Sequence, residues 1–267
     1  MPFPGSASAT TGEALPQFVQ GHGTPLVLLP GLSFSHGVPT GIIRAFESAL
    51  ALGLCAHHEV HWLGRRPGVP AGYTLADFAD DYADEIRRRF GRAMPVVGFS
   101  TGGLLGLQLA LDHPDVVERL VVIGAAGRLS DSARASDRRW IAALERGRLA
   151  DAWGALVSDI TDHAAAAGLL GSILGVAGPW ILPADCSDGI RTARAEVDVD
   201  LGASLSGMRV PTLLVVGGRD RNVGVGLATR TRAAIPGAEL LVLPRTGHLG
   251  SMVHRLTTDR IVRFLRP

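Results

Sequence analysis

Lysine is absent from this chain of 267 residues, because all 26 basic residues are arginine. That absence excludes the mechanisms that need a lysine side chain: a Schiff base, a pyridoxal phosphate site, a Walker-type phosphate loop and a Ser-x-x-Lys hydrolase. Cysteine is scarce as well, since only Cys55 and Cys186 occur. Two thiols cannot build a disulfide framework or a zinc site of four thiolates.

Net charge and long apolar runs are also lacking. The 26 basic residues nearly balance 25 acidic ones, which gives no electrostatic reason to expect nucleic acid or an anionic membrane as a partner. No stretch approaches the roughly 18 consecutive apolar residues of a membrane helix. The N-terminus has neither the basic start nor the apolar run of a signal peptide. We therefore expect a soluble cytoplasmic protein.

Hydrophobic residues make up 46% of the chain, and they recur in short apolar runs that alternate with segments of helical spacing. The predicted strands are 26–29, 59–63, 95–99, 120–123, 212–216 and 239–243. The predicted helices are 40–52, 75–90, 103–111, 227–235 and 252–265. Continuous apolar strands are buried on both faces, so we expect an α/β fold with a mostly parallel central sheet flanked by helices.

The stretch 128–206 interrupts this alternation. It has Ala- and Leu-rich helical patterning and no clear strand, and it holds Trp140, Trp153 and Trp180. A helical insertion over one end of the sheet is the simplest interpretation.

The segment Gly98-Phe99-Ser100-Thr101-Gly102 fits the pattern G-x-S-x-G. An apolar strand precedes it and an apolar helix follows it, as a nucleophile elbow requires. Glycines at the flanks let the strand and helix backbones approach closely, and the helix N-terminus places partial positive charge where an oxyanion forms. The motif predicts Ser100 as a nucleophile. The alternative is a passive serine in a glycine-rich turn.

A serine hydroxyl is a poor nucleophile without a base. Among nine histidines, His248 lies in a loop between the last strand and the last helix, from which a base can reach the elbow at the same sheet edge. Asp220 follows the strand 212–216 closely and is the carboxylate expected to orient His248. A turn-capping aspartate is the alternative for Asp220, and Asp198 and Asp200, in the inserted stretch, are weaker candidates.

The other histidines carry weaker signals. His36 is expected at the mouth of the pocket, and His254 is expected within the last helix as a surface or packing residue. The segment His57-His58-Glu59-Val60-His61 does not have the H-E-x-x-H spacing of a zinc site. We therefore expect no metal and no organic cofactor.

An oxyanion hole needs two backbone N–H groups aimed at one point. Thr101, the residue after the predicted nucleophile, supplies one of them. The loop Pro30-Gly31-Leu32-Ser33 follows an apolar strand, and we expect the N–H of Leu32 to supply the second. A contribution from the side chain of Ser33 is less favoured.

With these parts in the order Ser100, Asp220, His248, the sequence resembles the α/β-hydrolase fold family over about residues 18–266. The resemblance implies a hydrolase core of residues 1–127 and 207–267, with residues 128–206 as a helical cap that roofs the pocket and selects the substrate. The family usually has His-Gly in the oxyanion loop. Pro30-Gly31 replaces it here, which alters the hydrogen bonds that support the loop.

A small set of aromatic side chains is predicted to line the substrate pocket, namely Phe34, Phe99, Trp140, Trp153 and Trp180. Packing within the cap is the alternative, and for at least two of the tryptophans it is the interpretation that we favour.

The predicted reaction is acyl transfer from a small apolar ester, lactone or thioester through an acyl-enzyme on Ser100. Hydrolysis of a C–C bond in a diketone stays open, as does perhydrolase-type activity, since Gly98–Gly103 resembles cofactor-free haloperoxidase and perhydrolase relatives. A non-catalytic ligand-binding protein is the alternative from another class. A serine at the elbow, where haloalkane dehalogenases and epoxide hydrolases carry aspartate, argues against those relatives.

Overall fold

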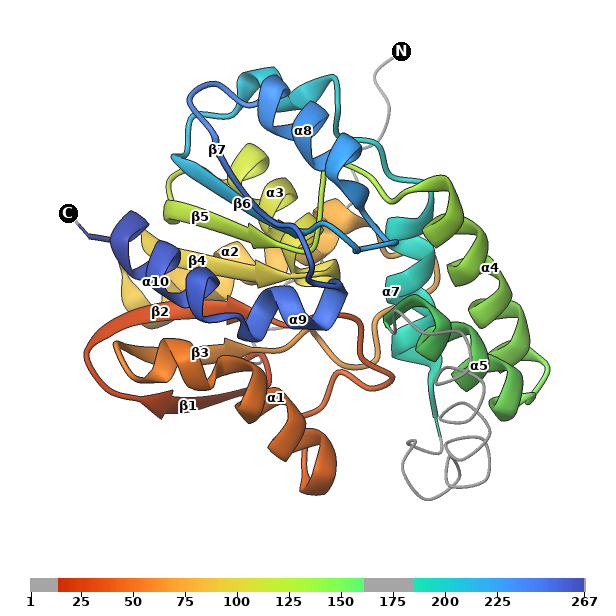
Figure 1. The fold of residues 1–267 in the computed structure, drawn as a ribbon. Coiled ribbons are helices and arrows are strands. Elements are labelled where there is room, and N and C mark those ends of the chain that lie inside the picture. Colours follow the sequence, from red (N-terminus) through yellow and green to blue (C-terminus); the bar gives the residue numbers. More distant parts are fainter. Residues whose placement is uncertain (1–13, 161–184, 267) are drawn as a thin grey trace, which may run out of the picture.

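The computed structural model describes residues 14–160 and 185–266 (Figure 1). Its strands form one seven-stranded sheet in the order β1-β3-β2-β4-β5-β6-β7. Their bounds are β1 Gln17–Gly21, β2 Thr24–Leu29, β3 His58–Leu63, β4 Met94–Phe99, β5 Val117–Ile123, β6 Thr212–Gly217 and β7 Glu239–Leu243. The helices around the sheet are α1 Gly41–Cys55, α2 Leu75–Phe90, α3 Thr101–Asp112, α8 Gly224–Ala234, α9 His248–Val253 and α10 Arg255–Phe264.

The strands from β3 to β7 in this order are mutually parallel, and β1 alone pairs antiparallel, with β3. The predicted strands omit β1. Its sequence, QFVQG, has one buried residue, Phe18, and it lies at the sheet edge. An edge strand half exposed to solvent needs no continuous apolar run, so the pattern that identifies the inner strands fails there.

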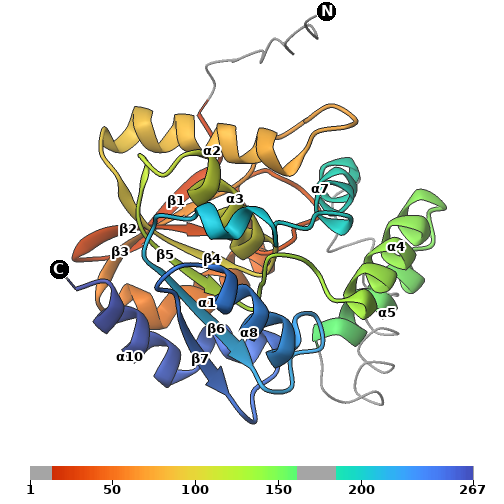
Figure 2. The same ribbon diagram turned by 90° about the horizontal axis from the view of Figure 1, so that it is seen from above.

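Helices cover both faces of the sheet (Figure 2). Val27 and Leu29 of β2 belong to the core cluster that holds α2 and α3. Leu26 and Leu28 belong to the opposite cluster, which holds residues of α1, α9 and α10. Each inner strand therefore buries both its faces, which is why these strands appear in the sequence as uninterrupted apolar runs. The predicted α/β architecture is confirmed.

The end of the chain differs from the prediction of one helix over 252–265. Two helices, α9 and α10, meet at His254, whose backbone is extended at φ −68° and ψ 133°. Its imidazole Nδ1 accepts a hydrogen bond from the Leu256 N–H at 3.2 Å and so caps α10. His254 is therefore a capping residue between two helices, and the prediction that it lies inside a helix is wrong.

The described part of 128–206 is helical. It contains α4 Asp131–Glu145, α5 Leu149–Ile160, α7 Ser187–Val197 and the short 3-10 turn η1 Ser204–Gly207. The helices α4, α5 and α7 lie beside the carboxyl ends of the parallel strands, to the right of the sheet in Figure 1. The turn η1 instead packs on the core, where Leu205 joins the cluster around α3.

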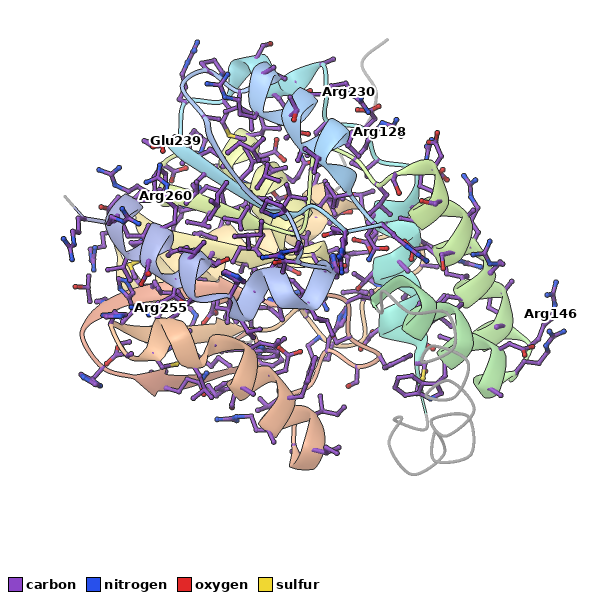
Figure 3. All side chains as sticks on the ribbon, in the orientation of Figure 1. Arg128, Arg146, Arg230, Glu239, Arg255 and Arg260 are labelled. Atoms are coloured by element: carbon purple, nitrogen blue, oxygen red, sulfur yellow. The ribbon has the colours of Figure 1, made fainter. Side chains whose placement is uncertain are left out.

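Charged side chains project outward from this frame (Figure 3). Arg255 is almost fully exposed, and the pair Arg260–Glu239 joins α10 to the edge strand β7. Within residues 14–160 and 185–266, no helix has both the length and the apolar character needed to span a membrane.

Candidate active site

Ser100 occupies the turn between β4 and α3 in a strained conformation. Its φ of 54° is the one positive value at a non-glycine position among the described residues. A Cβ atom on Gly98 would lie 2.2 Å from the Gly102 carbonyl oxygen, and one on Gly102 would lie 2.1 Å from the Leu29 carbonyl oxygen. Glycine is therefore required on both sides of the turn, as the motif predicts, and Ser100 stands at the carboxyl end of β4.

Three side chains from separate loops form one hydrogen-bonded chain. His248 Nδ1 lies 2.8 Å from Asp220 Oδ2, and His248 Nε2 lies 3.0 Å from Ser100 Oγ. A carboxylate only accepts, so Nδ1 carries a proton, and in that tautomer Nε2 is placed to accept from the serine hydroxyl. This arrangement brings together the three residues that the sequence predicts as a triad.

The Asp220–His248 pair is shielded from water. Its side chains are 0% and 3% exposed. The other oxygen of Asp220, Oδ1, accepts from the N–H groups of Asn222 at 2.9 Å and Val223 at 3.3 Å, so the carboxylate is held from both sides. Gly124 at the end of β5 leaves the space for the pair, because a Cβ there would lie 3.0 Å from His248 Cε1.

Arg65 supports the loop after β2. Its guanidinium is 2% exposed, and it donates to the Pro30 carbonyl at 3.2 Å and to the Gly31 carbonyl at 2.8 Å. It also donates to Ser33 Oγ at 2.8 Å. These bonds orient the peptide units on both sides of Gly31. The side chain of Ser33 is thereby an acceptor for Arg65. The loop also adjoins the elbow, since a Cβ on Gly31 would be 3.5 Å from Ser100 Cβ.

His36 lies beneath this loop, away from the predicted place at the pocket mouth. It is 1% exposed, its Nδ1 donates to the Arg66 carbonyl at 2.6 Å, and its Nε2 is 2.8 Å from Thr192 Oγ1 of α7. Burial, together with the nearby Arg65 charge, lowers the pKa of His36 to about 3. His36 is thus a neutral link between the core and α7.

A cavity of about 170 Å³ opens at Ser100. Leu32, Phe99, Ser100, Thr101 and His248 all line it, so these predicted site residues lie around one space. The Phe99 ring packs 5.1 Å from the His248 ring, measured between centroids.

The remaining aromatic predictions fall elsewhere. Phe34 packs against Trp140 and Trp153, with ring centroids 5.6 and 5.1 Å apart, and none of the three is among the described residues that line the cavity. The prediction that they line the pocket is therefore not supported, and the packing alternative fits these three residues, because the Phe34 ring packs on both tryptophan rings. Trp180 lies outside the described residues.

Three carboxyl side chains that the sequence analysis missed also line the cavity: Glu47, Asp137 and Glu196. Burial raises the pKa of Glu47, whose Oε2 accepts from Trp62 Nε1 at 3.1 Å. Burial and the nearby Asp137 charge raise the pKa of Glu196 to about 8. Both effects favour the protonated form of the Glu196 carboxyl.

The sequence held one signal for Glu196. In α7 it shares a face with Gly189, Thr192 and Ala193, all of them buried and uncharged. An acid on such a face marks an unusual environment. Arg65 had no comparable signal, because Arg65-Arg66-Pro67-Gly68 has the composition of a solvated turn.

Metal-ligating side chains do not converge in the part of the chain that the structure describes. No group of three or more His, Cys, Asp or Glu residues there is placed to hold an ion.

The chain is similar to known proteins both in sequence and in structure. A family model described as the alpha/beta hydrolase fold matches residues 24–255. Over 78 residues, the chain is 45% identical to a Yersinia enterocolitica protein provisionally named carbamate hydrolase RutD. The matched segment is 29% of this chain and 28% of that protein. It therefore spans well under two thirds of that relative's length.

A longer match joins the chain to the pimeloyl-[acyl-carrier protein] methyl ester esterase of Nitrosomonas europaea. The two are 28% identical over 245 residues, which is 85% of this chain and 90% of the esterase. The crystal structure of a hydrolase from Pseudomonas aeruginosa PA01 superposes with a TM-score of 0.76 at 23% identity and covers 94% of each chain. At that identity the structural likeness concerns the fold.

Proposed function

The chain belongs to the alpha/beta hydrolase fold family, and we propose that it is a serine hydrolase that cleaves a small carboxylic ester through an acyl-enzyme. The observation that carries the proposal is the hydrogen-bonded chain Ser100–His248–Asp220 at the wall of a cavity. A nucleophile, a base within hydrogen-bond distance and a third group that orients the base are the arrangement that acyl transfer requires.

In this mechanism His248 Nε2 takes the proton of the Ser100 hydroxyl as Oγ attacks the ester carbonyl carbon. The carbonyl double bond opens to a tetrahedral oxyanion, which the N–H groups of Thr101 and Leu32 stabilise. The C–O bond to the leaving alcohol then breaks, and the imidazolium of His248 protonates that oxygen. Asp220 keeps the ring in place and stabilises its positive charge.

The second half of the reaction uses the same groups. Water gives a proton to His248 Nε2 while its oxygen attacks the acyl carbon, and a second oxyanion forms. Its collapse releases the acid and returns the proton to Ser100 Oγ. The surroundings favour this use of His248, because the Asp220–His248 pair is shielded from water and α3 begins at Thr101, which directs its positive helix end to the same point.

Two further assignments belong to the proposal. Residues 128–206 act as the cap over the site, which accords with α4 and α7 contributing Asp137 and Glu196 to the cavity lining. The small size of the cavity, about 170 Å³, favours a short acyl group. Phe46, Leu50 and Leu104 also line it and supply apolar contact.

Carbamate hydrolysis is a second candidate, favoured by the name of the Yersinia relative. It begins with the same attack of a serine on a carbonyl carbon, and only the leaving group and the acyl substituent differ. A Klebsiella pneumoniae relative with the same name matches 90% of this chain at 26% identity, and the methyl ester esterase matches 85% at 28% identity. The length of the match therefore does not rank the two reactions, and we test ester hydrolysis first with carbamates as the next substrate class.

The test is hydrolysis of p-nitrophenyl esters with acyl lengths C2 to C12, beside labelling with a fluorophosphonate. We expect turnover with a maximum at short acyl lengths and a labelled peptide whose modified residue is Ser100. Labelling without turnover would move the search to lactones, thioesters, diketones and carbamates. Absence of both would contradict the proposal and favour a ligand-binding protein.

A further inference from the structure

Glu196 stands out among the residues around the cavity. It belongs to α7, is 3% exposed, and its Oε1 accepts a hydrogen bond from Thr101 Oγ1 at 3.1 Å. Its other oxygen, Oε2, is buried and has no hydrogen-bond partner among the described residues. A buried polar atom without a partner is destabilising, so its presence in the cavity lining beside the nucleophile points to a ligand that supplies a donor.

Several of the side chains that line the cavity are acidic. Glu47, Asp137 and Glu196 are acids, and no arginine is among the described residues that line the cavity. Arg65 acts electrostatically on Glu196 and favours its charged form. Its guanidinium, however, is engaged with the Pro30 and Gly31 carbonyls and with Ser33.

From this geometry we propose that Glu196, assisted by Asp137, is the specificity determinant for a substrate that carries a primary amino group on its acyl part. The ammonium donates to Glu196 Oε2, the oxygen that otherwise has no partner. This inference rests on the proposed function, because it assumes that the acyl part of an ester enters the cavity beside Ser100.

The charge balance of binding is favourable. Burial and the Asp137 charge raise the pKa of Glu196 to about 8, while Thr101 and Arg65 act in the opposite direction. In the empty site these effects favour a protonated Glu196, and the other titratable groups on the described part of the wall are Glu47, Asp137 and His248. An entering ammonium displaces that proton to solvent, and the carboxylate and the ammonium then neutralise each other inside the cavity.

The same lining acts against other substrates. A carboxylate on the acyl part would lie close to Asp137, and no arginine is among the described residues that line the cavity, so two like charges would meet in a buried site, which is unfavourable. An apolar acyl group would leave Oε2 without a partner. The predicted order of preference is therefore amino-substituted, then neutral, then anionic.

The test compares three methyl esters: those of 3-aminopropanoate, of butanoate, in which a methyl group replaces the ammonium, and of succinate as the monoester. Each is measured with the wild type, Glu196→Gln, Asp137→Asn and Glu145→Gln at pH 7. Intrinsic ester reactivity cancels when the amino-to-neutral ratio of kcat/KM is compared between proteins. Glutamine keeps the Oε1 acceptor for Thr101 and the volume of the side chain.

We expect Glu196→Gln to lower that ratio by ~10- to 100-fold, as for the loss of one buried charge-assisted hydrogen bond. Asp137→Asn should lower it less, by ~3- to 10-fold, because its effect is electrostatic. Glu145 lies at the end of α4 and pairs with Arg194 of α7 away from Ser100, so Glu145→Gln serves as the matched control. An unchanged ratio in Glu196→Gln would overturn the inference.

Binding to a Ser100→Ala protein separates this inference from the proposed function, because it needs no turnover. Titration followed by NMR should show tighter binding of the amino ester than of methyl butanoate, and the addition of Glu196→Gln should remove the difference. If that difference appears while the wild type cleaves no ester, the proposed function fails and the inference stands. Ester cleavage without the difference means that the inference fails.

Discussion

The two sides of the cavity are built in different ways. On the sheet side, Ser100, Asp220 and His248 each follow the carboxyl end of a parallel strand, and backbone geometry positions them. On the side of α4, α5 and α7, side chains supply many of the contacts with the core. Examples are the ring contacts of Phe34 with Trp153 and the hydrogen bond from Thr101 to Glu196.

This difference separates chemistry from selection. Moving a residue at a strand end requires moving the sheet, whose strands are buried on both faces, so the reacting groups are held rigidly. A side chain on α4 or α7 can be exchanged without altering a strand. We therefore expect substitutions on the sheet side to affect the rate for every substrate, and those on the helical side to affect the choice among substrates.

The largest expected effect belongs to the sheet side. Ser100→Ala removes the nucleophile and should lower kcat/KM for p-nitrophenyl butyrate by ~10⁴-fold or more. Its thermal unfolding should match that of the wild type. Ser35→Ala is the matched control, because Ser35 is exposed on the neighbouring loop. Retention of a tenth of the wild-type rate would mean that the reaction does not pass through Ser100.

Asp220→Asn comes next, with an expected loss of ~10³- to 10⁴-fold in kcat. An amide does not hold the His248 tautomer in which Nδ1 carries the proton. Asp200→Asn is the control, since Asp200 is an exposed acid that contacts Arg128 on the helical side. Equal rates for both variants would move the orienting carboxylate elsewhere.

His36 connects the two sides of the cavity, because it bonds the Arg66 carbonyl and Thr192 of α7. The pH dependence of the free energy of unfolding tests this contact. The pKa of His36 is lowered from 6.5 to about 3 in the folded state, so the unfolded chain binds more protons between these values. The stability that this group contributes is therefore full above pH 6.5 and is lost as the pH falls toward 3, by up to roughly 5 kcal/mol. Urea unfolding across this range measures it.

The pH effect should be weaker in His36→Gln, which has no imidazole to protonate. His22→Gln is the matched control, because His22 is exposed, and its unfolding should follow the wild type at each pH. Identical pH profiles for the wild type and His36→Gln would show that His36 is not the group responsible.

Arg65 acts on the sheet side of the cavity, where it supports the loop at Gly31. Arg65→Met leaves the Pro30 and Gly31 carbonyls without their donor, and we expect kcat to fall ~10- to 100-fold with a smaller change in KM. Arg65→Lys, with one compact donor group, should recover part of the rate.

Arg66→Met is the control for stability, because Arg66 pairs with Asp81 away from the cavity. It should lower the melting temperature while kcat stays within ~2-fold of the wild type. If Arg65→Met and Arg66→Met reduced kcat equally, the role of Arg65 would be structural only.

The sequence predicted the inner sheet well because its strands carry a strong local pattern. Continuous apolar runs such as Leu26–Leu29 identify strands that are covered on both faces. The edge strand β1 was missed, since Phe18 is its one buried residue and no continuous apolar run marks it. The break at His254 was missed as well, because the apolar spacing of α9 and α10 continues on one face through Met252 and Ile261.

The residues of the candidate site also differ in how far local sequence pattern indicates them. Ser100 stands in a motif whose glycines are required by close backbone approach, and Asp220 and His248 follow strands, so order along the chain indicated all three. For Phe34, Trp140 and Trp153 the sequence left pocket lining and packing as alternatives, because composition does not show whether a ring faces a cavity or another ring.

By itself, the sequence determined the order of strands and helices, the elbow at Ser100 and the residue types available for catalysis, because these depend on local spacing and on backbone sterics. Tertiary structure alone decided that Arg65 supports the Gly31 loop and that Asp137 and Glu196 meet beside Ser100. Those contacts join residues far apart in the chain, and the charge that each group carries depends on burial and on neighbours that no local pattern contains.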